Sequence, residues 1–416
     1  MKIAIIGSGI SGLTAAYLLH EEHELTLYEA NDYIGGHTHT HEIESEGKKW
    51  RVDSGFIVYN DKTYPNFIKL LRKLKIVSQK SSMGFSVKAP HKQLEYSGSS
   101  LNALFAQRRN LFRPSFYLMI KDVLRFNRVA KNELEGLVES MSIKEFLKQN
   151  KFSKHFIENY IIPMGAAIWS TAAEKTIEMS AEFYIRFFQN HGLLQIYNRP
   201  QWWVIKDGSK SYIEKIKEGF EKKIRLSTPV KKVIRHKNEV EVCFGKDGEY
   251  SNKFDKVIIA THSDQALQIL DNPNAKEMEI LGALPYQENE ALLHTDESIL
   301  PRKKQTWSSW NYLLNKDIKR PVTLTYSMNI LQSLTSKTHF LVTLNNSENI
   351  DPKKILKKLT YQHPLYTVEG VKSQKEKHLI SGQNNTFYCG AYWGNGFHED
   401  GVVSALDVCK FFGKTL

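Results

Sequence analysis

The stretch that decides the fold is Gly7-Ser8-Gly9-Ile10-Ser11-Gly12, which joins two apolar segments of different periodicity. The segment before it, Lys2–Ile6, is continuously apolar after its first residue and predicts a buried strand. The segment after it carries apolar residues at helical spacing through Leu19. A G-x-G-x-x-G turn between strand and helix is typical of dinucleotide binding. The first glycine makes the tight turn, the second admits a pyrophosphate, and the third packs helix on strand.

A carboxylate follows at the distance that this motif requires. Glu24–Tyr28 predicts a second strand, and Glu29 stands at its end, about 20 residues after the first glycine. A carboxylate at this point accepts hydrogen bonds from a ribose hydroxyl. The first 29 residues therefore predict a strand–helix–strand unit in which the six fingerprint residues and Glu29 bind a dinucleotide.

Further motifs follow in order along the chain and distinguish FAD from NAD. They are Glu29-Ala30 followed by Gly35-Gly36-His37, Val52-Asp53-Ser54-Gly55-Phe56, Ser227-Thr228-Pro229-Val230, Asp255 to Ala260-Thr261, and Tyr388-Cys389-Gly390 through Gly401. With the fingerprint, these strings resemble FAD enzymes of the amine-oxidase and phytoene-desaturase superfamily. The resemblance implies that FAD is bound noncovalently, since no attachment residue is identifiable. It adds these cofactor contacts: Ala30, Gly36, His37, Gly55, Phe56, Val230, Ala260, Thr261, Gly390, Asp400, Gly401 and Val402.

Other strings are similar to a bacterial subgroup of amine-oxidase-like, NAD/FAD-binding proteins. They are Asp53–Asn60, Thr63–Asn66, Trp310-Asn311-Tyr312, His363-Pro364 and Gly394–Gly401. Members of that subgroup are associated with cyclopropane, methylated and furan fatty-acid metabolism, which implies a lipid or fatty-acyl substrate. The resemblance favours an oxidoreductase that dehydrogenates, reduces or isomerises an unsaturated or methyl-branched fatty-acyl chain. The alternatives are an oxygen-using amine oxidase and a flavin-containing lipid- or membrane-binding protein without turnover.

The C-terminal motif carries the candidates for catalysis. His398 stands three residues before Gly401, where amine oxidases usually have a cage tyrosine, and this departure weighs against amine oxidation. An imidazole beside Glu399 and Asp400 suits proton transfer, so His398 is the first candidate for a general acid or base and Glu399 the second. A structural histidine is an equally weighted alternative. A last helix beginning at Gly401 would direct the amides of Gly401 and Val402 at the flavin.

The length indicates more than one domain, and the strand–helix–strand unit with the motifs indicates an α/β protein. The chain has 416 residues, of which 41% are hydrophobic and 25% charged, and this excludes a disordered chain, a collagen, a coiled coil and a disulfide-rich miniprotein. The motifs predict a discontinuous Rossmann-like FAD-binding domain from residues 1–60, 200–275 and 375–416. A mixed α+β substrate domain with a helical insertion is predicted from residues 61–199 and 276–374.

Several features bear on the compartment and on metals. The fingerprint glycines interrupt the apolar N-terminal segment, so export is not expected. Cys243, Cys389 and Cys409 form no CxxC pair, which favours a reduced, cytoplasmic setting. The alternating residues His37, His39 and His41 have no neighbouring cysteine or carboxylate to complete a first shell, so no metal is expected.

The basic charge is concentrated in one segment. The formal net charge is +12. Between Leu101 and Lys131 there is one acidic residue, Asp122, and there are seven basic residues: Arg108, Arg109, Arg113, Lys121, Arg125, Arg128 and Lys131. A helix here would place Met119, Val123, Phe126 and Ala130 on one face and Lys121, Arg125 and Arg128 on another. Such a helix suits an anionic surface on the inner membrane face, with a packing helix as the equal alternative. No nucleic-acid module accompanies the charge, and the sequence does not indicate an oligomeric state.

Overall fold

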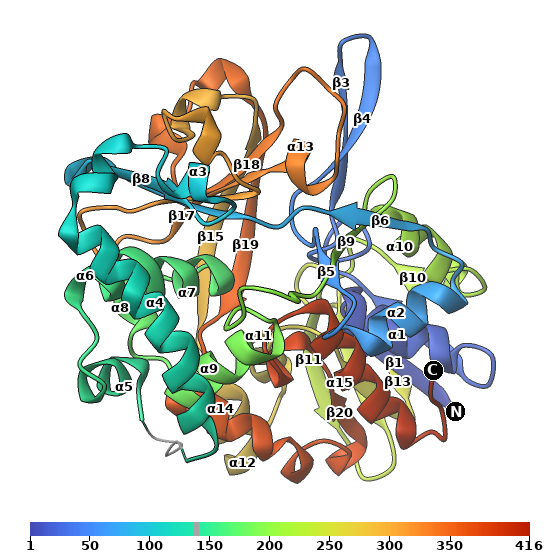
Figure 1. Cartoon of the computed structure of the whole chain (residues 1–416). Helices are drawn as coiled ribbons and strands as arrows, with labels where there is room; N and C mark the ends of the chain where they lie inside the picture. The colour runs from blue at the N-terminus through green and yellow to red at the C-terminus, as the bar shows by residue number, and fades with distance from the viewer. Residues whose placement is uncertain (137–140) are drawn as a thin grey trace.

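The computed structural model describes residues 1–136 and 141–416, and its first sheet is parallel and five-stranded (Figure 1). The strand–helix–strand prediction is confirmed residue for residue: β1 (Lys2–Ile6), α1 (Ile10–Leu19) and β2 (Glu24–Tyr28). The strand order is β10-β2-β1-β14-β20, with all neighbours parallel. The remaining members are β10 (Ile224–Arg225), β14 (Lys256–Ile259) and β20 (Thr386–Tyr388), and α1 packs against the C-terminal helix α15 (His398–Lys410).

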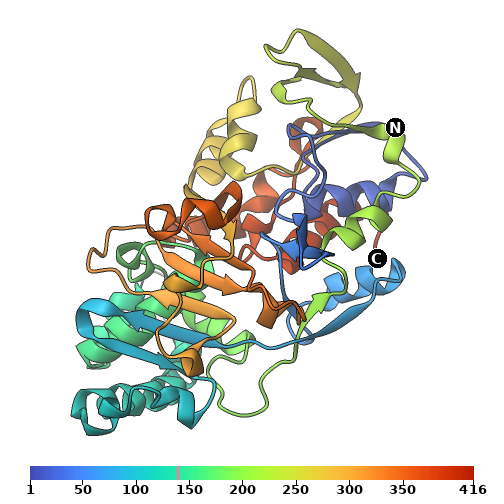
Figure 2. The same cartoon turned by 90° about the horizontal axis from the view of Figure 1, so that it is seen from above.

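The second sheet has seven strands in the order β19-β15-β18-β17-β16-β7-β8. All its pairs are antiparallel except β16 with β7. Its strands are β7 (Phe85–Ala89), β8 (Leu94–Ser97), β15 (Tyr286–His294), β16 (Trp310–Leu313), β17 (Thr323–Ser327), β18 (Leu341–Leu344) and β19 (Ile355–Pro364). From above, the two sheets lie in different halves of the molecule (Figure 2). A small antiparallel sheet, β11 (Val230–Arg235), β12 (Val240–Phe244) and β13 (Tyr250–Phe254), flanks the first half.

Helices cover the outer side of the second half (Figure 1). They are α3 (Leu101–Leu104), α4 (Pro114–Glu133), α5 (Ile143–Gln149), α6 (Lys154–Phe156), α7 (Ile162–Trp169), α8 (Ala173–Thr176) and α9 (Ala181–Asn190). A π-helical turn, Ile157–Ile161, joins α6 to α7. The helices elsewhere are α2 (Pro65–Lys73), α10 (Lys210–Ile216), α11 (Ser263–Ile269), α12 (Ala275–Gly282), α13 (Met328–Leu331) and α14 (Val368–Lys375). In the described part of the chain, no helix has the length and apolar content needed to cross a membrane.

The predicted amphipathic helix exists as α4, but the prediction of its membrane face was wrong. Met119 and Phe126 are each 1% exposed and pack inside the larger hydrophobic core. Phe126 contacts the rings of Phe146 and Phe156, at centroid distances of 6.2 and 5.7 Å. This face of α4 is therefore buried within the protein and is not available to a bilayer.

The two halves are joined through strands on both sides of the predicted domain boundaries. β5 (Tyr59–Asn60), β6 (Ser78–Ser81) and β9 (Trp202–Ile205) form one small sheet, although residues 60/61 and 199/200 were predicted as boundaries. The hairpin of β3 (Thr40–Ser45) and β4 (Lys48–Asp53) reaches from the first half to the second, where the Asp53 amide donates to Gln332 Oε1 at 3.0 Å. The parallel sheet draws its strands from ranges 1–60, 200–275 and 375–416, and the seven-stranded sheet from the other two.

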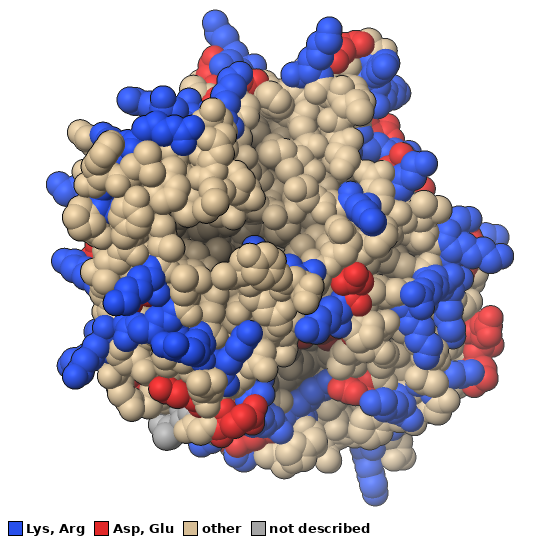
Figure 3. Space-filling model, viewed as in Figure 1, with Lys and Arg blue, Asp and Glu red and all other residues tan. Residues whose placement is uncertain are grey.

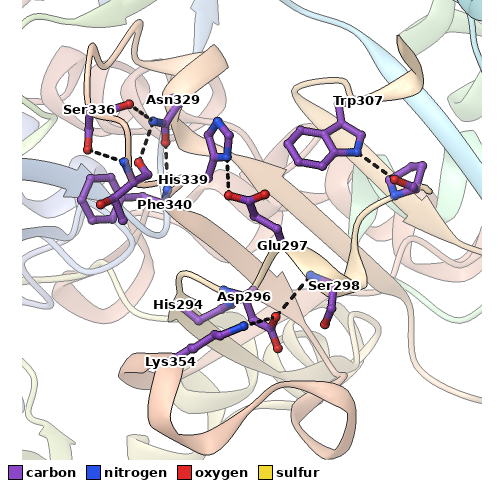
Figure 4. A network of polar contacts seen from close by, with 12 residues as sticks. His294, Asp296, Glu297, Ser298, Trp307, Asn329, Ser336, His339, Phe340 and Lys354 are labelled. Atoms are coloured by element: carbon purple, nitrogen blue, oxygen red, sulfur yellow. Dashed lines mark hydrogen bonds and ion pairs between the residues drawn. The ribbon is translucent and has the colours of Figure 1, made fainter. Parts of the chain in front are cut away.

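A polar network ties the loops at one end of the seven-stranded sheet (Figure 4). Asp296 follows β15 and contacts Lys354 Nζ at 3.0 Å, just before β19. His339 Nδ1 lies 2.7 Å from Glu297 Oε1, and the Asp296 amide donates to His294 Nδ1 at 3.0 Å. These contacts fix the end of β15 and β19 opposite to Tyr286 and Pro364. The end of both strands that carries Tyr286 and Pro364 borders the site described below.

Candidate cofactor and active site

A cavity of about 840 Å³ opens between the two halves, and the fingerprint turn lines one part of it. Many of the predicted site residues meet there: Gly7, Ser8, Gly9, Ile10, Ser11, Glu29, Ala30, Gly36, His37, Gly55, Phe56, Val230, Ala260, Thr261, Gly390 and His398. Gly12, Glu399, Asp400, Gly401 and Val402 are not among its lining residues. Figure 3 shows one face of the molecule hollowed near its centre, with uncharged side chains around much of the hollow.

The fingerprint turn has the geometry that an anionic group requires. Gly7 has φ 103°, which favours glycine, and its amide donates to Tyr28 O at 2.8 Å. A Cβ on Gly9 would meet no protein atom within 4 Å, whereas one on Gly12 would collide with the Gly7 carbonyl. Gly9 is also the N-cap of α1, and no side chain caps this helix start. The open space at Gly9 and the uncapped amides of α1 therefore fit a pyrophosphate.

Glu29 is buried at the same end of the cavity and is already held by the protein. Its Oε2 accepts hydrogen bonds from the Ser8 amide at 2.9 Å and the Ser8 hydroxyl at 2.6 Å. Its Oε1 accepts from the amide and the side chain of Asn31, both at 2.9 Å. The carboxylate thus fixes the fingerprint turn, and its two oxygens already accept two hydrogen bonds each, so a ribose hydroxyl would replace or share one of these bonds.

Replacing Glu29 with alanine is expected to weaken FAD binding about ten- to a hundredfold, because hydrogen bonds to a charged group contribute about 1.5–3 kcal/mol. Titration of the FAD-depleted protein with FAD measures this. Glu24→Ala, on the exposed start of the same strand, is the matched control and should bind as the wild type does. Equal FAD affinity in the Glu29 and Glu24 variants would show that the Glu29 carboxylate ends a strand and has no role in FAD binding.

His398 borders the cavity, but its imidazole is enclosed by protein groups. Its ring stacks on Phe56 with centroids 3.5 Å apart, and Nε2 lies 3.0 Å from Thr38 Oγ1 and 3.1 Å from the Tyr212 hydroxyl. Burial, reinforced by His37, holds the pKa of His398 well below its ordinary value, so the ring is neutral. These contacts are those of a positioning residue, and a role in proton transfer stays a prediction.

Glu399 and Asp400 face away from the main cavity and line a second one of about 500 Å³. Glu399 Oε1 accepts from the Asn66 amide at 3.0 Å, and Oε2 accepts from the Phe67 amide at 2.8 Å. The carboxylate therefore satisfies the free amides at the start of α2. Asp400 accepts from the Phe397 amide at 2.9 Å, and burial raises its pKa to about 6.

The last helix begins at His398 and not at Gly401, so the prediction of its flavin-facing amides was wrong. The Gly401 amide donates to Phe397 O at 3.1 Å, inside the helix, and Val402 is fully buried in a hydrophobic core. Gly401 has a packing role, because a Cβ there would come within 2.7 Å of Ile10 Cγ2 and 3.0 Å of Ser11 Oγ. Its small size lets α15 approach α1 directly behind the fingerprint.

Histidines gather around His37, which sequence spacing alone had grouped with His39 and His41. The ring of His37 lies 6.0 Å from His262 and 5.6 Å from His363. Burial lowers the pKa of His37 and His262 to about 4 and that of His363 to about 3. Among residues 1–136 and 141–416, no group of three His, Cys, Asp or Glu residues is arranged to hold a metal ion.

The far part of the cavity is formed by residues outside the cofactor motifs, although Trp310 belongs to the string Trp310-Asn311-Tyr312. Trp310, Tyr326 and Leu344 come from three neighbouring strands of the seven-stranded sheet, and Thr360 comes from β19 at its edge. Of all described residues that line the cavity, Glu29 and Lys231 are the only ones with an Asp, Glu, Lys or Arg side chain. Both lie at the fingerprint end, since Thr228, three residues before Lys231, donates its amide to Glu29 O. The end against the sheet is uncharged.

Two polar side chains at the uncharged end have no hydrogen-bond partner among the described residues. Trp169 and Tyr366 line the cavity and are 5% and 2% exposed, yet Trp169 Nε1 and the Tyr366 hydroxyl form no hydrogen bond with a described residue. Phe183 lies between them, with ring centroids 5.6 Å from Trp169 and 4.7 Å from Tyr366. Both atoms are enclosed by the surrounding side chains.

The family model for flavin containing amine oxidoreductases matches residues 10–321, about three quarters of the chain. Curated relatives match locally. An L-amino-acid oxidase of Bungarus fasciatus is 43% identical over 54 residues, 13% of this chain, and one of Siganus canaliculatus is 44% identical over 54 residues, again 13%. The chain spans about a tenth of the length of these relatives.

Solved structures match over nearly the whole length. A fatty acid isomerase from P. acnes, described as producing CLA, has a TM-score of 0.71 at 14% identity, covering 99% of this chain and 98% of that one. Cyclohexylamine oxidase from Brevibacterium oxydans has a TM-score of 0.68 at 15% identity, covering 99% of both chains. These likenesses establish the fold. The family model, which matches about three quarters of the chain, shows that the chain belongs to the family of flavin-containing amine oxidoreductases, and the open space at Gly9, the uncapped α1 and the buried Glu29 fit its cofactor FAD.

Proposed function

We propose that the protein is an FAD-dependent oxidoreductase that dehydrogenates, reduces or isomerises an unsaturated or methyl-branched fatty-acyl chain. The observation that carries this proposal is the absence of Asp, Glu, Lys and Arg from the described residues at the sheet end of the cavity. A protonated amine or an amino acid placed there would lose its hydration without gaining a charged partner, which costs several kcal/mol. An acyl chain has no charge to desolvate, and its transfer out of water is favourable in free energy.

The walls of the sheet end suit a chain of methylene groups. Trp310 and Tyr326 present aromatic rings at a centroid distance of 5.4 Å, and Leu344 continues the same face of the sheet. Ile57 and Ile168 add aliphatic surface to the lining. The likeness in fold to a fatty acid isomerase agrees with this choice, although the two chains share only 14% identity.

In the reaction, bound FAD supplies the ring that accepts and returns electrons. The chain's own residues hold the cofactor and orient the acyl chain. Gly9 and the start of α1 would bind the pyrophosphate, and Glu29 holds the fingerprint turn beside the ribose. The rings of Trp310 and Tyr326 exclude water from the reacting carbons.

An oxygen-using amine oxidase is the second candidate, since the family and the local match to L-amino-acid oxidases favour it. The uncharged sheet end disfavours it. The two candidates differ in substrate, because only the amine oxidase would oxidise an amine, with release of peroxide.

Gas chromatography coupled to mass spectrometry, which separates double-bond isomers of equal mass, tests the proposal on acyl chains incubated with the FAD-loaded protein. Unsaturated and methyl-branched fatty acids, free and within phospholipid, are the substrates. We expect double bonds to move, appear or disappear, and we expect no peroxide from amines. Unchanged acyl chains together with rapid peroxide release from a primary amine would overturn the proposal in favour of the second candidate.

Trp310→Glu is expected to lower acyl turnover about tenfold or more, because it places a carboxylate against an apolar chain. The FAD content should not change, since Trp310 belongs to the seven-stranded sheet and not to the fingerprint end. Trp310→Phe, which keeps an aromatic surface, is the matched control and should retain most activity. An equal loss of acyl turnover in both variants would show that the Trp310 ring supports the packing of the cavity wall and does not contact the acyl chain.

A further inference from the structure

The outer surface of residues 101–131 exposes an unusual amount of apolar side chain. Six of the 17 exposed large hydrophobic residues of the described chain lie within residues 101–124: Leu101, Leu111, Phe112, Tyr117, Leu118 and Leu124. Phe112 is 85% exposed and Leu101 78%. We call these six residues, together with the basic residues Arg108, Arg109, Arg113, Lys121, Arg128 and Lys131, the outer patch. Apolar clusters of this kind mark interaction sites on soluble proteins.

The helix α4 carries two apolar faces, and only one of them is used within the protein. The inner face, with Met119 and Phe126, fills the core. On the outer face, Tyr117, Lys121, Leu124 and Arg128 follow at intervals of three or four residues and share one side of the helix. Apolar and basic side chains thus alternate along the exposed side, as in helices that lie at a membrane interface.

The positive charge of the outer patch is not neutralised by the protein. Asp122 is buried and pairs with Arg125 at 3.1 Å, and Arg125 also donates to Asn150 O and stacks on Phe152. The opposite charges of Asp122 and Arg125 therefore cancel. The other six basic residues of the segment form no ion pair with any described residue: Arg108, Arg109, Arg113, Lys121, Arg128 and Lys131. In Figure 3, Lys and Arg side chains gather over the part of the face where α4 lies in Figure 1.

From this combination we infer that the outer patch docks on an anionic lipid bilayer. A bilayer of that kind takes both groups at once, since apolar side chains enter the boundary of the acyl region while cations meet the headgroups. A second copy of the chain would bring six uncompensated cations against six more. A nucleic acid would leave Leu101 and Phe112 in water. The inference goes beyond the proposed function and does not depend on the substrate.

Co-sedimentation of the FAD-loaded protein with vesicles tests the inference. Vesicles of phosphatidylcholine alone and of phosphatidylcholine with phosphatidylglycerol are the probes. We expect binding to the anionic vesicles that fades as salt is added, and little binding to the neutral ones. Binding of equal strength to both, or to neither, would overturn the inference.

Paired variants separate the outer patch from the rest of the surface. Lys121→Glu with Arg128→Glu should weaken anionic-vesicle binding on the order of thirtyfold or more, at about fivefold per cation lost. Lys222→Glu with Lys223→Glu makes the same charge change on an exposed turn elsewhere and should have little effect. Phe112→Ser should weaken binding, whereas Ile318→Ser, at another exposed site, should not.

The flavin spectrum shows that each of these variants is folded, because none of the altered residues lines the cavity. Equal vesicle binding by the patch variants and their controls would contradict the inference. Self-association or nucleic-acid binding that the patch variants abolish, without any vesicle binding by the wild type, would assign the surface to a different partner and also contradict it.

Discussion

Replacing Gly9 with valine is expected to give a folded protein that retains almost no FAD. Gly9 has φ −68° and ψ 178°, which any residue adopts, and a Cβ there would meet no protein atom within 4 Å. The substitution therefore costs the fold little. The added side chain instead fills the part of the cavity that fits the pyrophosphate. The measurements are the ratio of flavin to protein absorbance after purification and the urea midpoint.

Two other glycines provide the controls for this variant. Gly98 is exposed and also has free space for a Cβ, so Gly98→Val should keep both FAD and stability. Gly12→Val should disturb folding itself, because the Cβ would collide with the Gly7 carbonyl. Normal FAD content in a folded Gly9→Val protein would refute the assignment of the fingerprint.

Acid is expected to destabilise the FAD-depleted protein strongly below about pH 6.5. Burial lowers the pKa values of several histidines to about 4 or less: His37, His41, His191, His262, His294 and His363. Since their folded pKa values lie below the unfolded value, the unfolded chain binds more protons as the pH falls below 6.5. The stability they provide is present above that pH and is lost between about 6.5 and 4.

Each such histidine contributes roughly 1.4 kcal/mol per pH unit in that window. Between about pH 7.5 and 5.5 only about one pH unit lies inside this window, so six of them together remove on the order of 8 kcal/mol, a large part of a typical total of about 5–15 kcal/mol. Urea midpoints at about pH 7.5 and 5.5 measure the loss. His363→Gln should reduce the slope, because one buried imidazole is removed. A midpoint that does not change between these pH values would contradict the burial of these rings.

The sequence predicted the first half of the fold closely, because the information there is local. The residues of β1, α1 and β2 follow one another without interruption, and the turn between them needs glycine at fixed positions. The start of α15 was placed three residues late, at Gly401, since the glycine was interpreted as a helix start. The acidic pair Glu399 and Asp400 was the better signal, because acids favour the first turn of a helix.

The orientation of α4 could not be predicted from its periodicity. The helix has one apolar stripe with Met119 and Phe126 and another with Tyr117, Leu118 and Leu124. Which stripe is buried depends on α6 and α9, which pack against α4 from later in the chain. A single sequence contains no signal for that choice.

The uncharged end of the cavity could not be predicted from the sequence for a similar reason. Trp169 and Tyr366 are separated by almost 200 residues and belong to no motif of the fingerprint type. They meet across Phe183 only because α7, α9 and the loop after β19 come together. Tyr366 had a weak signal in the neighbouring string His363-Pro364, and Trp169 had none.

Anaerobic mixing of the FAD-loaded protein with unsaturated acyl lipids and, separately, with primary amines tests the central claim most directly. The observable is the absorbance of the oxidised flavin. Because the sheet end of the cavity is apolar and uncharged, we predict that the acyl lipid shifts or bleaches this absorbance and that amines leave it unchanged. Rapid bleaching by amines, with no response to any acyl lipid, would contradict the account.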